Sequence, residues 1–125
     1  MPILNIIECA YRATLEEQDD TILWLSRSLQ NNGADVSILL RGNAVNYAAK
    51  QRCPPLAIGG SGIPHPADPN HELAQLQAKG ATIYVLRDDL DQRGIQSSQL
   101  INGVTLIAAS AVAETMEQYS QVWHW

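Results

Sequence analysis

Apolar residues along this chain form short runs that alternate with segments of helical spacing. The runs have the length of buried strands and contain few polar residues, which is typical of strands covered on both faces of a sheet. Between the runs, apolar residues recur at the spacing of one helix face. Strands are predicted over 3–9, 36–40, 81–86, 104–107 and 121–123, and helical segments over 15–31, 44–50, 69–79, 87–95 and 111–119.

Residues that begin and end helices support several of these boundaries. Thr14 and Glu17 have the spacing of a capping box, in which each side chain bonds to the backbone amide of the other. Gly33 ends the first helix, because glycine takes a positive φ at no steric cost. Asp68, followed by Pro69, caps the 69–79 helix. Ser110 is the expected cap of the last helix.

Strands that alternate with helices favour a mostly parallel sheet with helices on both faces. The chain has 125 residues, which is the length of one domain, and no linker or shift in composition divides it. We therefore expect an α/β fold in a single domain over residues 1–125.

Residues 53–68 interrupt this alternation with a long loop rich in proline and glycine. Loops of this length are usually functional or mobile. The stretch Gly59-Gly60-Ser61-Gly62 resembles a phosphate-binding loop, but no Lys-Ser or Lys-Thr follows it and the third glycine of a dinucleotide motif is absent. A lid or a turn is the favoured interpretation.

The charge balance narrows the function classes. The formal net charge is −5 and the sequence pI is about 4.9, which argues against a nucleic-acid partner. No apolar run reaches the roughly 18 residues of a membrane span, and the N-terminus does not resemble a signal peptide. With only two cysteines, a disulfide framework is not expected. We therefore expect a cytoplasmic protein with no membrane or nucleic-acid partner.

In open parallel sheets, ligands bind beyond the carboxyl ends of the strands. That rule selects Cys9 after the first strand, Arg41 and Asn43 after the second, and Arg87 after the third. We expect the site among these residues, with the 53–68 loop at the same edge.

Cys9 is the candidate catalytic residue, with two interpretations. It is a nucleophilic thiolate activated by a nearby cation, or a small apolar residue that fills a strand end. Cys53 lies beside Arg52, in a basic setting that favours a reactive thiol, although an incidental loop cysteine explains it equally well.

No metal or cofactor is expected. The spacing of His65, Asp68 and His71 matches no metal-binding motif. The acidic residues of the 87–95 segment are expected to cap a helix and to pair with Arg87 or Arg93; they are Asp88, Asp89 and Asp91.

Residues 80–95, which read Gly-Ala-Thr-Ile-Tyr-Val-Leu-Arg-Asp-Asp-Leu-Asp-Gln-Arg-Gly-Ile, resemble the DsrE/DsrF-like family. The likeness extends to 100–104, 121–123 and 41–45. It implies a three-layer α/β/α domain with a five-stranded, mainly parallel sheet, and assembly into trimers or hexamers. It also implies a relation to sulfur relay, in which some members carry sulfur as a cysteine persulfide.

The chain departs from the family at the residues that carry sulfur. The position of the acceptor cysteine is Leu86 here, and a second family cysteine falls on Asp89. We therefore expect a non-catalytic, homo-oligomeric subunit that binds a partner protein or a small ligand at the strand ends, with the terminal Trp123-His124-Trp125 as a subunit contact. The alternatives are a persulfide carrier that uses Cys9 and a nucleotide- or anion-binding module. The candidate binding residues are Arg41, Asn43, Arg87, Gly60 and Gly62.

Overall fold

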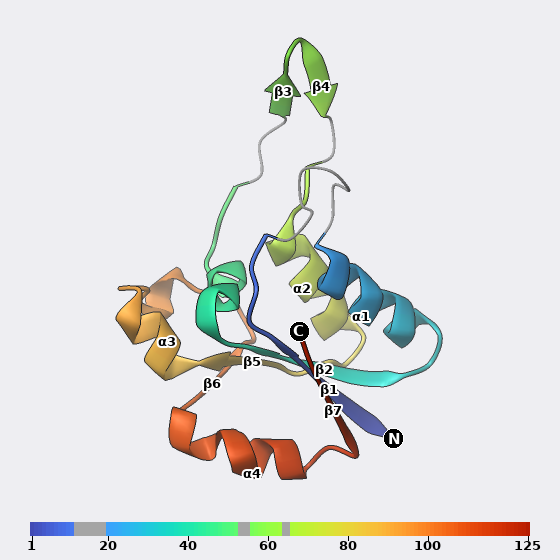
Figure 1. Cartoon of the computed structure of the whole chain (residues 1–125), viewed down its shortest axis with the longest axis vertical. Helices are drawn as coiled ribbons and strands as arrows, with labels where there is room; N and C mark the ends of the chain where they lie inside the picture. Colours follow the sequence, from blue (N-terminus) through green and yellow to red (C-terminus); the bar gives the residue numbers. More distant parts are fainter. Residues whose placement is uncertain (12–19, 53–55, 64–65) are drawn as a thin grey trace.

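Five parallel strands form the central sheet of the computed structural model, which describes residues 1–11, 20–52, 56–63 and 66–125 (Figure 1). The order across the sheet is β6-β5-β2-β1-β7, so β1 and β2 lie inside it and β6 and β7 are its edges. The strands are β1 (Pro2–Ile7), β2 (Asp35–Leu40), β5 (Ile83–Leu86), β6 (Thr105–Ile107) and β7 (Gln121–His124).

Helices cover both faces of the sheet, which confirms the predicted three-layer α/β/α architecture (Figure 1). One face carries α1 (Thr21–Asn31), α2 (Pro69–Ala78) and the 3-10 helix η1 (Gly42–Ala48), and the opposite face carries α4 (Val112–Glu117). The remaining helices are α3 (Arg87–Gln92), η2 (Ser97–Gln99) and η3 (Ala109–Ala111). Among the described residues, no helix is both long and apolar enough to cross a bilayer.

The apolar runs arise because β1 and β2 are buried on both faces. Successive side chains of a strand point to opposite faces. Leu39 therefore packs with Leu4 and Ile6 on the face covered by α4, whereas Ile38 and Leu40 join the core on the face covered by α1 and α2. A run without polar alternation is what this double burial requires.

Several predicted boundaries are correct for the expected reasons. Gly33 follows the end of α1 with a φ of +93°. The Asp68 side chain accepts a hydrogen bond of 3.1 Å from the His71 amide, and Pro69 is the first residue of α2. These signals act within a few residues of chain, so the sequence alone reveals them.

Other boundaries differ from the prediction. The first helix begins at Thr21 rather than at residue 15, because the extended backbone and carboxylate of Asp20 make it the N-cap; the predicted capping box at 14–17 lies outside the described residues. Ser110 lies inside η3 and does not cap α4, whose N-cap is Ala111. The first strand ends at Ile7, so Cys9 lies two residues beyond it.

The predicted 53–68 loop contains an antiparallel hairpin, formed by β3 (Leu56–Ile58) and β4 (Ser61–Ile63). Gly59 and Gly60 form its turn, with φ values of +56° and +82°. Two positive φ values give the tightest hairpin turn, and Gly-Gly between two short runs is its sequence signal. The hairpin stands clear of the three layers (Figure 1).

A buried carboxylate ties α1 to η1. Asp20 is 2% exposed, and its Oδ1 accepts hydrogen bonds from the amides of Ile22 (3.0 Å) and Leu23 (2.9 Å). Its Oδ2 accepts a 2.5 Å hydrogen bond from the hydroxyl of Tyr47, which is fully buried. Burial, and then the bond to Asp20, raise the pKa of Tyr47 far above its ordinary value, so the hydroxyl remains a donor.

Replacement of Asp20 by alanine is expected to destabilise the protein more than the same change at the other described aspartate cap. Asp20→Ala removes the N-cap and leaves the buried Tyr47 hydroxyl without its acceptor, at a cost of about 2–3 kcal/mol in the free energy of unfolding. Asp68→Ala removes one cap bond, at a cost of about 1 kcal/mol. Urea unfolding of both variants measures the difference, and equal losses would contradict the role given to Tyr47.

Candidate functional site

Because the five strands are parallel, the segments that leave them start at the same edge of the sheet. Four predicted site residues belong to these segments. Cys9 follows β1, Arg41 and Asn43 follow β2, and Arg87 follows β5.

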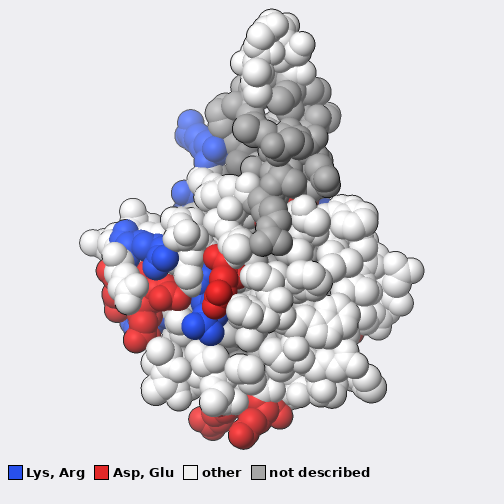
Figure 2. Space-filling model, viewed as in Figure 1, with Lys and Arg blue, Asp and Glu red and all other residues white. Residues whose placement is uncertain are grey.

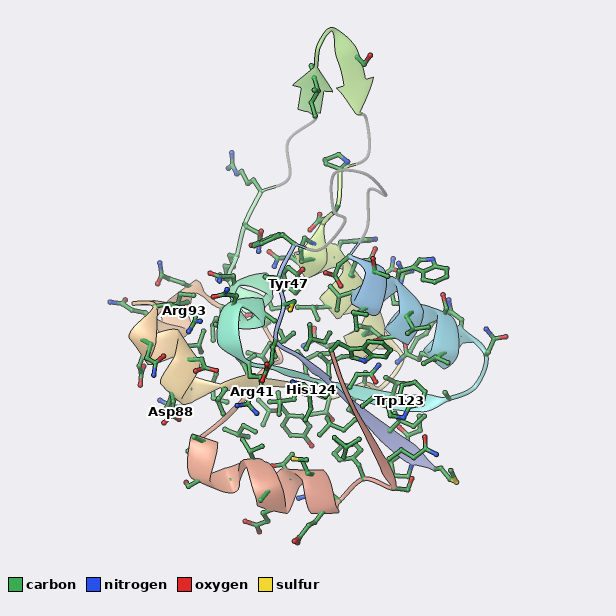
Figure 3. The ribbon with its side chains drawn as sticks, viewed as in Figure 1. Arg41, Tyr47, Asp88, Arg93, Trp123 and His124 are labelled. Atoms are coloured by element: carbon green, nitrogen blue, oxygen red, sulfur yellow. The ribbon has the colours of Figure 1, made fainter. Side chains whose placement is uncertain are left out.

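A charged cluster joins three of the strand ends. Oε1 of Glu8, just past β1, lies 3.0 Å from Nε of Arg41 and 3.2 Å from Nε2 of His124 in β7. Figure 3 shows Arg41 and His124 close together at the middle of the molecule. The three side chains are between 39% and 57% exposed, so these pairs contribute little to stability. Within this cluster, the negative charge of Glu8 offsets the positive charge of Arg41.

Cys9 is an exposed free thiol next to this cluster. The backbone of its segment is held on both sides: the Glu8 amide donates to the carbonyl of Trp125 at 3.0 Å, and the Tyr11 amide donates to the Tyr47 hydroxyl. Tyr11 has a φ of +59°, an uncommon conformation for a residue with a side chain. The exposure is compatible with a reactive thiol. The interpretation of Cys53 lies outside the described residues.

Asn43 takes part in a contact between helices. Its Oδ1 accepts a 2.9 Å hydrogen bond from Nη2 of Arg93, and Nη1 of Arg93 donates to the carbonyl of Asp89 at 3.1 Å. Oδ2 of Asp89 accepts a 2.6 Å hydrogen bond from the amide of Gly42. The predicted binding residue Asn43 and the family-related position 89 therefore both hold η1 against α3.

Leu86 is the last residue of β5 and is only 4% exposed. Its side chain is a buried hydrocarbon at the position where the resemblance places a sulfur-carrying thiol. Arg87, the next residue, begins α3 and is exposed.

Arg87 also lines a groove of about 520 Å³, which lies within the usual volume range of small-molecule sites. Sequence reasoning selected Arg87 but missed the rest of this groove. Gly94 is the sequence feature that could have revealed the groove. Its φ of +65° turns the chain back after α3, and polar residues of the next segment then lie beside Arg87. The other lining residues are Leu90, Asp91, Gly94, Ile95, Gln96, Ser97, Ser98 and Leu106.

The two predicted binding glycines lie elsewhere. Gly60 belongs to the hairpin turn and Gly62 to β4, and the hairpin projects away from the strand ends (Figure 1). The structure therefore does not bring Gly60 and Gly62 together with Arg41 and Arg87.

Two of the acidic residues of α3, Asp88 and Asp89, bind backbone amides rather than arginine side chains. Oδ1 of Asp88 accepts a 2.9 Å hydrogen bond from the Ala109 amide, and Asp89 binds Gly42 as above. Among the described residues, no ion pair joins these acids to Arg87 or Arg93, so the expected pairing is wrong. The same residues contain no cluster of three His, Cys, Asp or Glu side chains arranged for a metal ion.

The end of the chain is part of the sheet and its core. The Trp125 amide donates a 2.9 Å hydrogen bond to the carbonyl of Ile6, and its side chain packs against the core under α1 and α2. Trp123 is half-buried within β7. Intramolecular packing therefore already uses part of the apolar surface that suggested a subunit contact.

Two solved structures share this fold. The ychN protein from E. coli superposes with a TM-score of 0.74 at 18% identity, over 100% of both chains. MTH1491 from Methanobacterium thermoautotrophicum, a protein of unknown function, gives 0.67 at 12% identity, over 98% of this chain and 97% of its own. No curated protein matches the sequence.

The family comparison covers nearly the whole chain. The model of the DsrE/DsrF-like family matches residues 9–123, from Cys9 beyond β1 to Trp123 in β7. This range includes the described strand ends, α3 and the groove. The chain therefore belongs to the DsrE/DsrF-like family.

Proposed function

We propose that this chain is a non-catalytic member of its sulfur-relay-related family, and that it acts by binding a small polar ligand. The observation that carries the proposal is Leu86, a hydrocarbon side chain at the end of β5 where the family resemblance places the acceptor cysteine. A hydrocarbon offers no lone pair that can accept sulfur. We further expect a homo-oligomer that acts in the cytoplasm, and both remain predictions.

Asp89, which stands where the resemblance places a second cysteine, also supports a non-catalytic function. Asp89 accepts the Gly42 amide at 2.6 Å, so its carboxylate is engaged in holding η1 against α3. A carboxylate engaged in this way serves the fold and cannot relay sulfur. Both positions where the family carries a thiol therefore have other physical roles here.

Arg87 and the groove beside it favour ligand binding. Among the described residues that line the groove, Arg87 is the only cation, while Asp91, Gln96, Ser97 and Ser98 supply oxygen and amide groups and Leu90 and Leu106 supply apolar surface. This mixture of apolar surface with a few polar groups is typical of small-molecule sites. The ligand we propose is small and carries an acidic group that faces Arg87.

One observation favours a second function. Cys9 is exposed beside the Glu8–Arg41–His124 cluster, which makes it the best-placed described residue for a persulfide carrier. The nucleotide-binding alternative has less support, because Gly60 and Gly62 lie on the hairpin and Glu8 offsets the charge of Arg41.

Incubation with a polysulfide donor distinguishes the first two functions. We expect no adduct of one extra sulfur atom that passes on to a low-mass thiol, because the acceptor position is Leu86. Intact-protein mass spectrometry of wild type, Cys9→Ser and Cys53→Ser measures the adduct. A transferable adduct that Cys9→Ser loses and Cys53→Ser keeps would replace the binding function with a persulfide carrier.

Ligand binding in the groove is tested with thiosulfate, inorganic phosphate and a small carboxylate as probes. A ligand at one hundred times its Kd adds about 2.7 kcal/mol to stability, which raises Tm by roughly 5 °C or more in a chain of this size. Arg87→Gln is expected to abolish the rise. Arg52→Gln is the matched control, because it removes the charge of another exposed arginine that does not line the groove. An unchanged rise in Arg87→Gln would place the binding elsewhere.

A further inference from the structure

Two residues of opposite charge lie one helical turn apart on α3, and both line the groove beside it. Arg87 and Asp91 are separated by four residues of helix, which is about 6 Å along the helix axis. Both side chains are exposed. Figure 2 shows charges of both signs side by side over α3. The groove therefore offers a positive group and a negative group to the same ligand.

Arg87 and Asp91 have no ion-pair partner among the described residues, and they do not pair with each other. A base pairs best with an acid that precedes it by four residues in a helix, and here the order is the reverse. The neighbouring charged residues are engaged: Asp88 and Asp89 accept hydrogen bonds from backbone amides, and Arg93 donates to a side chain of η1. The two groove charges are therefore available to a ligand.

The stability of α3 does not explain the positions of these two charges. The helix dipole favours acids in the first turn of a helix and bases in the last turn. Asp88 and Asp89 follow this rule, whereas Arg87 is the first residue of α3 and Asp91 belongs to its last turn. Departures from such local rules are expected at functional sites. Ligand binding gives Arg87 and Asp91 a role that the helix does not.

Apolar and hydroxyl groups complete the groove. Leu90 is buried, and Ile95 and Leu106 are partly buried, so they offer apolar contact to a ligand. Ser97 and Ser98 add hydroxyl groups, which can donate to a carboxylate or accept from an ammonium group. A ligand that complements the whole groove carries an anionic group, a cationic group and an apolar part.

We propose that the ligand of this groove is a small zwitterion, namely a free α-amino acid with an apolar side chain. This inference rests on the proposed function and specifies its ligand. The carboxylate of the amino acid pairs with Arg87 and its ammonium group with Asp91, while its side chain packs on Ile95 and Leu106. A simple anion fits less well, because an anion bound to Arg87 is repelled by Asp91, whereas a zwitterion complements both charges.

Isothermal titration calorimetry with L-leucine and two of its derivatives tests the proposal. N-acetyl-L-leucine keeps the carboxylate and lacks the ammonium group, whereas L-leucinamide keeps the ammonium group and lacks the carboxylate. We expect the wild-type protein to bind leucine at least about tenfold more tightly than either derivative, because each derivative loses one charge-assisted hydrogen bond.

Asp91→Asn separates a zwitterion site from a simple anion site. The substitution removes the negative charge at nearly constant shape, so we expect leucine to bind about tenfold more weakly and N-acetyl-leucine to bind at least as tightly as to wild type. Asp35→Asn is the matched control, because it makes the same substitution at an exposed aspartate that does not line the groove. Its affinities are expected to equal those of wild type, and circular dichroism establishes that both variants keep the fold.

The outcomes distinguish this inference from the proposed function. Equal binding of leucine and N-acetyl-leucine, unchanged in Asp91→Asn, would overturn the zwitterion and leave an anion site at Arg87. A lack of leucine binding would also overturn it, and the proposed function would stand if thiosulfate, phosphate or a small carboxylate still stabilised the protein through Arg87. If none of these probes bound, both proposals would be wrong.

Discussion

Burial of β1 and β2 on both faces is the constraint from which the rest of the molecule follows. Side chains of these two strands fill the core under α1 and α2 on one side and the core above α4 on the other. Parallel pairing then sends every strand end to the same edge. Glu8 and Cys9, Arg41, the start of α3 and His124 lie at this edge as a consequence of this packing, although they come from four distant parts of the sequence.

Several polar side chains near that edge form hydrogen bonds that join one helix to another, including residues that the sequence suggested as binding residues. Asp20 and Tyr47 connect α1 to η1 through a buried hydrogen bond. Asn43, Asp89 and Arg93 connect η1 to α3. Arg87 differs from these residues, because it faces a groove instead of a neighbouring helix. This contrast is why the proposed ligand site centres on Arg87.

The groove and the hairpin differ in shape and in charge. The groove is concave and combines an arginine, an aspartate and hydroxyl groups, which suits a small polar molecule. The hairpin stands clear of the three layers, and its residues carry no charged side chain.

The sequence by itself determined the alternation of strands and helices, the parallel sheet and the helix ends at Gly33 and Asp68, because hydrophobic period and capping act over short stretches of chain. The resemblance to the family also predicted from the sequence that Leu86 stands where an acceptor cysteine is expected. Only the tertiary structure decided that α1 begins at Thr21 with Asp20 as its N-cap, because the Asp20 carboxylate is also bound by Tyr47, which lies 27 residues away in the sequence. The same holds for the pairing of Glu8 with Arg41 and His124 and for the groove beside Arg87. Contacts between distant segments depend on how the helices pack on the sheet, and no local pattern of residues encodes that.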